Sequence, residues 1–189
     1  MRAQLYLGIG YQQLAIHANL KSDRELYNRL ALETLEKAVQ NDANDHLCEY
    51  YLSLQYALLN NITEALAHIR FSLALRTEHA PSLHLFALLL TASRRPREAL
   101  AVVEDALEEF PENLNLLHVK AHLQLHLQDA EIALVTVQRM LAIWRELYEG
   151  QINAVEDEKQ SDTKSVVLHV YSSQMSDKDS SECQVEIEN

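Results

Sequence analysis

Glycine and proline are scarce in this chain, which holds three of each in 189 residues. The turns of an all-β protein draw heavily on both residues, so their scarcity disfavours a sheet-based fold. Leucine, alanine, glutamate and glutamine, which all form helices well, are abundant instead. Because 48% of the residues are hydrophobic, the chain can also bury a sizeable core. The composition therefore predicts an all-α protein.

Positive charge is scarce as well. Lysine and arginine number 16 against 28 aspartates and glutamates, which gives a formal net charge of −12. Nucleic-acid binding needs concentrated positive charge to neutralise phosphates, so nucleic acid is not expected as a partner. The same charge disfavours docking on an anionic membrane. The two cysteines, Cys48 and Cys183, lie far apart in the sequence, which argues against a disulfide framework and fits a reducing compartment such as the cytoplasm.

Long hydrophobic runs are missing. The most apolar stretch, Leu85 to Leu90, is far shorter than the roughly 20 residues that span a bilayer, and Arg94, Arg95 and Arg97 follow it closely. The N-terminal stretch MRAQLYLGIG carries one positive charge and no pattern typical of signal-peptide cleavage. We therefore expect no direct insertion into a membrane.

Motifs that carry catalysis are missing too. The only glycines are Gly8, Gly10 and Gly150, so no glycine-rich phosphate loop is present, and no serine-nucleophile motif occurs. Cys48 stands beside Glu49 without a basic neighbour that would lower its pKa, which indicates a packed residue rather than a nucleophile. The sequence predicts neither a catalytic site nor a cofactor, and we do not expect an enzyme.

What the chain does have is an internal repeat. An Ala-Leu pair recurs at a constant spacing, with alanine at positions 31, 65, 99 and 133, and a small residue precedes the last three at the same distance each time, at Ser53, Ala87 and Ala121. Small residues at these places would let two antiparallel helices approach closely, while larger apolar residues complete each inward face. The repeat predicts four helix pairs, in units of about 1–45, 46–79, 80–113 and 114–149. The first unit is longer by the stretch IHANLKSDREL, which we expect to form a surface loop between its helices.

The repeated residues resemble a tetratricopeptide repeat array. That pattern places Leu-Gly and Tyr in the first helix of a unit, Ala and a large apolar residue in the second, and Pro at the end. The fourth unit departs from it at Lys120, Gln124 and Met140. The resemblance implies a right-handed α-solenoid of about four helix-turn-helix units. The matching residues are Leu7, Gly8, Tyr11, Ala31, Leu35 and Ala38, then Leu52, Ser53, Tyr56, Ala65 and Ile69, then Phe86, Ala87, Leu90, Ala99, Val103, Ala106 and Pro111, and finally Ala121, Ala133 and Val137.

The first helices of such units build a concave groove. In register, the groove residues are apolar, aromatic or histidine, and this composition suits a helix or peptide ligand. Packing against further repeats explains the same residues almost as well. The candidate protein-binding groove consists of Leu47, Tyr50, Tyr51, Leu54, His84, Leu88, His118, His122 and His126.

Three of these histidines, His118, His122 and His126, fall at every fourth position of one helix, and His84 lies one repeat before the first. Two histidines four apart can bind zinc. No nearby Cys, Asp or Glu completes a tetrahedral set, so we predict no metal site.

The composition changes after the fourth unit. Residues 150–189 are rich in Ser, Asp and Glu and lack a helical apolar period, which predicts a disordered tail or linker. The N-terminal AQLYLGIGYQQLAI begins on an apolar face, whereas repeat arrays need polar outer faces at their ends. We therefore expect a piece or short form of a longer solenoid.

A closer resemblance covers roughly Tyr6 to Tyr148. The stretches DHLCEYYLSLQYALLNNITEALAHIRFSLAL, SLHLFALLL, EFPEN and MLAIWRELY, with Trp144 late in the last helix, resemble the tetratricopeptide repeat protein 7 family. That resemblance implies a non-catalytic scaffold of the complex that delivers phosphatidylinositol 4-kinase alpha to the plasma membrane. It implies three partners: the kinase, hyccin and a lipidated plasma-membrane adaptor. The chain would then be cytoplasmic and recruited to the plasma membrane through these partners.

Three functional hypotheses remain open. The first is this lipid-kinase scaffold, and the second is a generic adaptor that binds a peptide or helix in its concave groove. The third and weakest is a metal site at the groove histidines, for which substitution of His118 and His122 would abolish metal uptake. Substitution of Tyr50 and Tyr51 would damage a groove-binding adaptor but spare a scaffold that uses its other surfaces.

Overall fold

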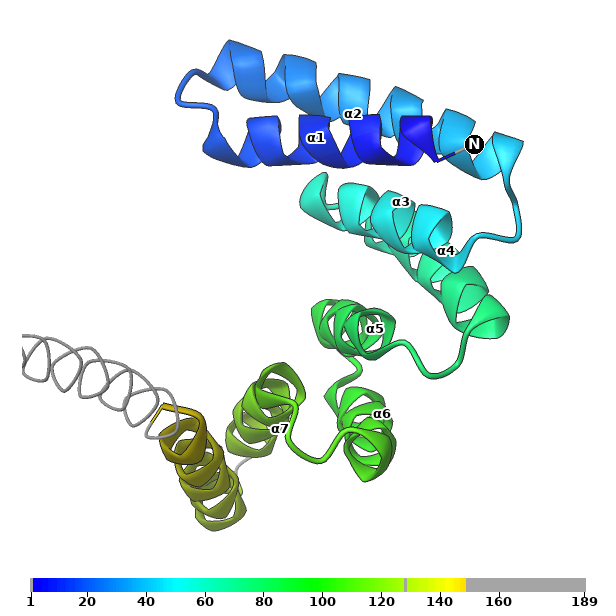
Figure 1. The fold of residues 1–189 in the computed structure, drawn as a ribbon. Helices are drawn as coiled ribbons and strands as arrows, with labels where there is room; N and C mark the ends of the chain where they lie inside the picture. The colour runs from blue at the N-terminus through cyan, green and yellow to red at the C-terminus, as the bar shows by residue number, and fades with distance from the viewer. Residues whose placement is uncertain (1, 128, 149–189) are drawn as a thin grey trace, which may run out of the picture. The chain divides into compact units, whose positions relative to one another are not determined.

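The computed structural model describes residues 2–127 and 129–148, and all regular structure in that part of the chain is helical. This confirms the predicted all-α class (Figure 1). The connections between helices are short, so consecutive helices run antiparallel. The helices are α1 (Ala3–His17), α2 (Lys21–Asn41), α3 (His46–Leu58), α4 (Ile62–Leu75), α5 (Ala80–Ala92), α6 (Pro96–Glu109), α7 (Leu114–His126) and a further helix over residues 130–148.

The helices pack in sequence order. α1 packs on α2, α3 on α4 and α5 on α6, and the first helices also contact one another, α1 with α3, α3 with α5 and α5 with α7. The chain divides into two compact units, Met1–Met140 and Leu141–Asn189, and all seven labelled helices belong to the first. The predicted array of helix pairs is therefore present. No helix in the described part of the chain combines the length and apolar character needed to cross a membrane.

The repeated small residues lie where each pair of helices comes closest. Ala31, Ala65 and Ala99 are fully buried and Ala133 is 6% exposed, as the repeat predicts. The small residues of the first helices, Gly8, Ser53, Ala87 and Ala121, are buried as well. Gly8 shows why size matters: a Cβ atom there would lie 2.6 Å from Cγ of Leu35 on α2. The Ser53 hydroxyl on α3 donates a hydrogen bond to the Ala65 carbonyl on α4, at 2.8 Å.

Two of the turns between paired helices, α3–α4 and α5–α6, share one conformation. Asn60 and Arg94, which lie one repeat apart, both adopt positive φ, at 61° and 60°. The amide of the next residue then reaches back to a carbonyl of the first helix, from Asn61 to Tyr56 at 2.8 Å and from Arg95 to Leu90 at 2.9 Å. This is the hydrogen bond of a Schellman helix end. The Asp129 amide reaches the Gln124 carbonyl in the same way, at 2.9 Å, so this bond recurs at three turns.

The starts of the first helices also recur once per repeat, at Asp45, His79 and Asn113. The Asp45 carboxylate accepts a hydrogen bond from the Leu47 amide at 3.0 Å and pairs with Arg2 at 3.2 Å. The Asn113 side chain accepts from the amides of Asn115 and Leu116, both at 3.1 Å. These bonds satisfy amides that have no partner inside the helix. His79 makes no such cap and instead contacts the Ser82 hydroxyl at 2.7 Å.

The prediction of a surface loop in the first unit is wrong. The stretch IHANLKSDREL lies partly in α1 and partly in α2, and only residues 18–20 connect the two helices. α1 and α2 are accordingly 15 and 21 residues long, compared with 13 and 14 for α3 and α4. The physical reason is local, because KSDREL consists of residues that a helix tolerates, with Asp23 in the first turn near the positive end of the helix dipole.

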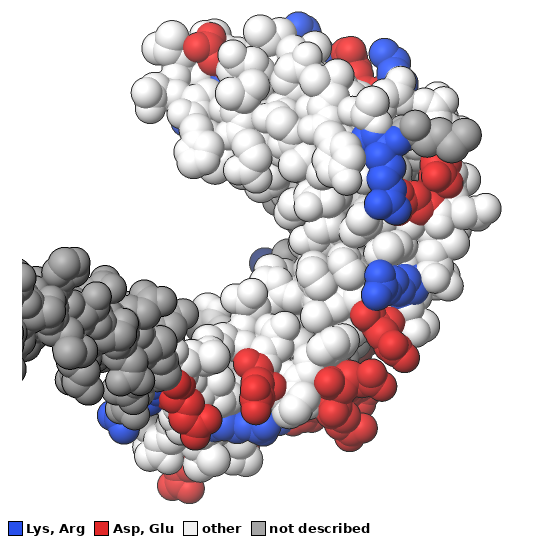
Figure 2. Space-filling view, viewed as in Figure 1, with Lys and Arg blue, Asp and Glu red and all other residues white. Residues whose placement is uncertain are grey.

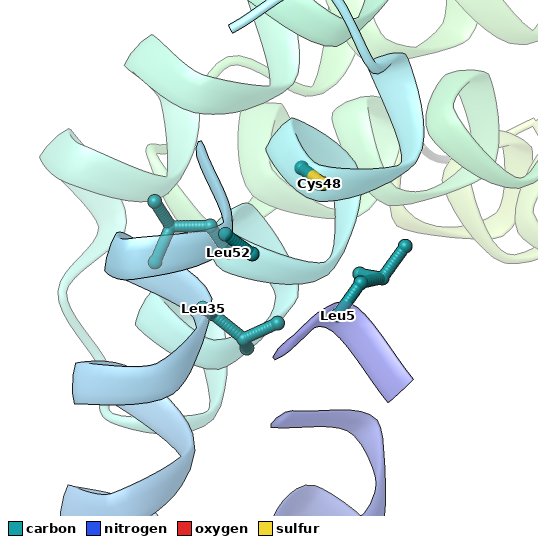
Figure 3. Close-up of a cluster of buried hydrophobic side chains, with 5 residues drawn as sticks. Leu5, Leu35, Cys48 and Leu52 are labelled. Atoms are coloured by element: carbon teal, nitrogen blue, oxygen red, sulfur yellow. The ribbon is translucent and has the colours of Figure 1, made fainter. Parts of the chain in front are cut away.

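The core is a chain of small clusters between neighbouring helices. One cluster joins Leu5, Leu35, Cys48 and Leu52 (Figure 3), and a second lies around Ala65, Ile69, Leu85 and Leu89. In the first cluster, burial raises the pKa of the Cys48 thiol to about 11, with smaller contributions from nearby carboxylates. Cys48 is therefore a core residue, as its sequence context predicts. The stretch Leu85 to Leu90, whose residues other than Phe86 and Leu88 are buried, lies within one repeat unit.

The predicted tail, residues 150–189, lies outside the described residues, as does Cys183.

Candidate protein-binding surface

The nine predicted groove residues all lie on first helices of the helix pairs. α3 carries Leu47, Tyr50, Tyr51 and Leu54, α5 carries His84 and Leu88, and α7 carries His118, His122 and His126. In the view of Figure 2, the edge that α3, α5 and α7 form in Figure 1 shows almost no charged side chains. The predicted set therefore lies on a face with few Lys, Arg, Asp or Glu side chains (Figure 2), in a chain whose net charge is −12.

Exposure along this surface is uneven. The four residues of α3 are half-buried: Leu47 and Tyr51 pack on the cluster around Leu52, and Tyr50 and Leu54 pack on the cluster around Ile69. On α5, Leu88 is 43% exposed, and the three histidines of α7 are exposed. The surface on α5 and α7 is thus more accessible than that on α3, where side chains also join neighbouring helices. Binding of a protein in the groove stays a prediction.

An aromatic cluster joins α3 to the start of α5. The ring of Tyr50 meets those of Tyr51 and His79 edge to face, at centroid distances of 5.0 and 5.4 Å, and His79 meets His46 at 5.0 Å. Burial lowers the pKa of His79, and His46 and Arg76 lower it further. His46 Nε2 is buried and has no hydrogen-bond partner in the described part of the chain. The sequence reasoning missed His46 and His79, although both lie at the starts of first helices in successive units.

The groove histidines do not assemble a metal site. Burial, and then the charge of His118, lowers the pKa of His84. His122 and His126 instead line a separate pocket of about 490 Å³ with Thr91, Arg94 and Pro96. Among the described residues, no three His, Cys, Asp or Glu side chains are arranged to hold a metal ion.

A second polar network, which the sequence did not reveal, joins the first two helix pairs. Nδ1 of His68 on α4 lies 2.7 Å from the buried Glu49 carboxylate, and its ring stacks on Tyr56 at 5.3 Å. The Tyr56 hydroxyl donates to Glu36 on α2 at 2.9 Å. Burial, followed by this hydrogen bond, raises the pKa of Tyr56 to about 12. These four residues are paired with one another, so the network is a structural connection between α2, α3 and α4 rather than a reactive site.

Two of the fourth unit's departures from the repeat pattern serve packing. Gln124 is buried, and its side-chain oxygen accepts a hydrogen bond from Thr136 at 2.7 Å. Lys120 pairs with Glu104 on α6 at 3.1 Å. The polar residues at these positions are satisfied by the neighbouring helices, which explains how the repeat continues without the usual apolar residues.

Comparison with solved structures supports the repeat fold. A crystal structure of MamA has a TM-score of 0.66 at 16% identity, and the match covers 77% of this chain and 79% of that one. The TPR protein TTC0263 of Thermus thermophilus has a TM-score of 0.62 at 18% identity, covering 75% of this chain and 73% of that one. At these identities the likeness shows the tetratricopeptide-type fold alone. No family model matches the chain.

Curated proteins give a stronger match in sequence. Tetratricopeptide repeat protein 7A of Homo sapiens is 40% identical over 147 residues, which are 78% of this chain and 17% of that protein. Tetratricopeptide repeat protein 7B is 39% identical in Homo sapiens and 38% identical in Mus musculus over the same length. The chain thus spans about a sixth of the relatives that it matches. Over those 147 residues, the resemblance to the tetratricopeptide repeat protein 7 family that its residues predict is confirmed.

Proposed function

We propose that this chain is a non-catalytic scaffold that helps to localise and stabilise phosphatidylinositol 4-kinase alpha at the plasma membrane. Its partners would be the kinase, hyccin and a lipidated plasma-membrane adaptor, which would bring an otherwise cytoplasmic chain to the membrane. The similarity to tetratricopeptide repeat proteins 7A and 7B over 147 residues carries this proposal.

The surface of the first helices supports a role in protein binding. It shows few Lys, Arg, Asp or Glu side chains in Figure 2 and includes the exposed Leu88 and the histidines of α7, and its α3 residues pack on two buried clusters. Rigid helical surfaces that present apolar and aromatic side chains suit a partner helix or peptide. The same surface supports the second candidate function, a generic adaptor whose groove takes an extended or helical segment.

Co-purification of the full chain with hyccin, and separately with the kinase, tests the proposal. A complex that survives size-exclusion chromatography with either partner is the expected result. If the chain is folded and monomeric yet binds neither, the lipid-kinase role is wrong and the generic adaptor becomes the better account.

A matched pair of substitutions then locates the binding surface. Leu88 on α5 and Leu75 on α4 are each 43% exposed, but only Leu88 belongs to the groove. Glutamate already occupies the position one repeat after Leu75, at Glu109, so Leu75→Glu is a tolerated control. If the groove binds the partner, Leu88→Glu weakens the complex and Leu75→Glu leaves it unchanged. The reverse result would place the interface on the second helices.

A further inference from the structure

A pocket opens between the second helices of the second and third units. It has a volume of about 310 Å³, and helices α4, α5 and α6 all contribute to it. We call it the α4–α6 pocket. Its apolar lining consists of Leu73, Leu83, Phe86, Val102, Ala106 and Phe110. None of these residues belongs to the groove of the first helices.

The repeat explains why space remains at this place. One unit earlier, the positions of Val102 and Ala106 are occupied by His68 and Ser72. His68 extends to the Glu49 carboxylate at 2.7 Å, and the Ser72 hydroxyl donates to the His46 carbonyl at 2.9 Å. Valine and alanine are shorter and apolar, so α6 cannot make the corresponding contacts to α5.

One unit later, the corresponding positions again carry polar side chains that are bonded to neighbouring residues. Thr136, one repeat after Val102, bonds to Gln124 at 2.7 Å, and Arg139, one repeat after Asp105, donates to the Pro111 carbonyl at 2.9 Å. In the units before and after, polar side chains at these positions of the second helix are therefore bonded to neighbouring helices, whereas Val102 and Ala106 leave the pocket with an open apolar floor.

Carboxylates surround this floor. Thr77, Glu78, Asp105 and Glu109 complete the lining, and no ion pair involves any of the three carboxylates within the described residues. The negative end of the α6 dipole lies at Glu109 and adds to the same field. One nearby cation is Arg70, whose guanidinium carbon lies 6.0 Å from the centre of the Phe86 ring. Figure 2 shows acidic side chains gathered in the region that α6 occupies in Figure 1.

Two cations close to α6 are engaged with glutamates away from the pocket. Arg95 is bonded to Glu98 at the other end of the helix, and Lys120 is bonded to Glu104. Because the residues that line the pocket include three carboxylates and no lysine or arginine, the rim is negatively charged beside an apolar floor. A ligand gains most here if it buries an apolar side chain and places positive charge next to it.

We propose that the α4–α6 pocket docks a partner protein segment in which one or two large apolar side chains are flanked by lysine or arginine. The apolar side chains enter between Phe86, Val102 and Phe110, and the flanking cations face Glu78, Asp105 and Glu109. The volume is at the lower end of the range for ligand pockets, which fits the side chains of a short segment rather than a whole domain. This docking uses a different surface from the groove and does not depend on the lipid-kinase role.

Fluorescence anisotropy with the full chain tests this docking. The probe is a fluorescein-labelled peptide, acetyl-Gly-Lys-Arg-Leu-Leu-Lys-Arg-Gly-amide, and two comparison peptides replace either its basic residues by glutamate or its leucines by serine. Only the first peptide is expected to bind, and added salt should weaken its binding because the flanking charges are exposed. Equal binding of the glutamate peptide or of the serine peptide would overturn the proposal.

Variants of the chain test whether the peptide binds in the pocket. Asp105→Asn with Glu109→Gln keeps the shape of the exposed rim and removes two charges, which should weaken binding about threefold to thirtyfold. The control, Glu108→Gln with Glu112→Gln, changes the net charge equally at exposed residues that do not line the pocket, and should bind as the unchanged chain does. Equal weakening by both double variants would refute a specific site.

Filling the pocket provides an independent measurement. Val102→Trp should abolish peptide binding while leaving the helical circular dichroism unchanged, whereas retained binding would contradict docking in the pocket. Co-purification with the kinase and hyccin should survive the Asp105→Asn, Glu109→Gln double variant. Failure of the pocket proposal and failure of the scaffold proposal are thus seen in separate experiments.

Discussion

Two glycines of α1, separated by a single residue, offer a direct test of the close approach between paired helices. Both are helical, but they face different surroundings. A Cβ at Gly8 would lie 2.6 Å from Cγ and Cδ2 of Leu35, whereas a Cβ at Gly10 would meet nothing within 4 Å. Alanine is the better helix former by about 1 kcal/mol at either position. The two substitutions share this gain and differ only in packing.

The cost at Gly8 follows from Leu35. This leucine is fully buried between α1, α2 and α3, and its Cγ, which cannot swing away as a chain end can, is one of the atoms in the way. Forcing extra atoms into such a core costs typically about 1–3 kcal/mol. After the gain in helix propensity, Gly8→Ala should lower the free energy of unfolding by about 0–2 kcal/mol. Gly10→Ala should raise it by about 1 kcal/mol.

Urea unfolding followed by circular dichroism measures both variants against the unchanged chain. The expected separation between them is about 1–3 kcal/mol, which is well resolved by shifts in midpoint at constant slope. The double variant Gly8→Ala, Leu35→Val tests whether the contact with Leu35 is the cause, because a shorter residue at position 35 should recover part of the lost free energy of unfolding. If Gly8→Ala stabilises the chain as much as Gly10→Ala does, helix packing at this position is not as close as the structure has it, and the reasoning is refuted.

Three further predictions concern single residues. Arg94→Gly should stabilise the chain by roughly 0.5–1 kcal/mol, because Arg94 holds a positive φ that costs an L-residue about 1–2 kcal/mol and glycine's greater loss of conformational freedom on folding offsets only part of this cost. Asn60→Gly should stabilise the chain less, since asparagine tolerates this conformation. An equal or larger gain at Asn60 in thermal unfolding would contradict the argument. In a Cys183→Ser background, Cys48 should react with a maleimide only after denaturation, because it is buried and its pKa is raised to about 11; rapid labelling of the native chain would show that the first core cluster is open. The free energy of unfolding should fall as the pH drops below 6.5, the ordinary pKa of histidine. The folded state lowers the pKa of His79 below that value, so the unfolded chain binds the proton at a higher pH than the folded chain does. His79→Gln should make this loss smaller in denaturant titrations over that pH range, and an unchanged pH dependence would count against the buried environment of His79.

The repeat could be read from the sequence because it rests on local rules. Alanine at 31, 65, 99 and 133 marks the positions where helices touch, and only small residues fit there, so their constant spacing identified the elements and their partners. The counterpart of these small residues in the first unit, Gly8, does not keep this spacing because of the extra stretch between positions 16 and 26, and it was matched through the Leu-Gly of the tetratricopeptide pattern instead. Its position against Leu35 becomes clear only when the two helices are seen together.

Contacts between units were much harder to predict. The network from Glu49 through His68 to Tyr56 and Glu36 joins residues that are charged or polar in sequence and carry no repeat signal. The groove assignment placed Tyr50 and Leu54 on first helix α3, but it could not show that both also pack against α4 and α5. Such contacts depend on how one unit is rotated relative to the next. The residues that make them do not recur at the repeat spacing, so the sequence pattern does not reveal them.

The polar network that begins at Glu49 has a mechanical consequence. Between α2, α3 and α4, a continuous line of hydrogen-bonded and stacked side chains resists shear, so the first two helix pairs should move as one stiff block. In the described part of the chain, no hydrogen bond or ion pair links α4 directly to α6, and the side-chain hydrogen bond that joins α4 to the third unit is the one between the hydroxyls of Ser72 and Ser82, at 3.0 Å. Bending within residues 2–140 should therefore concentrate at that junction. A side chain inserted between α4 and α6 would therefore change the curvature of the array at this junction.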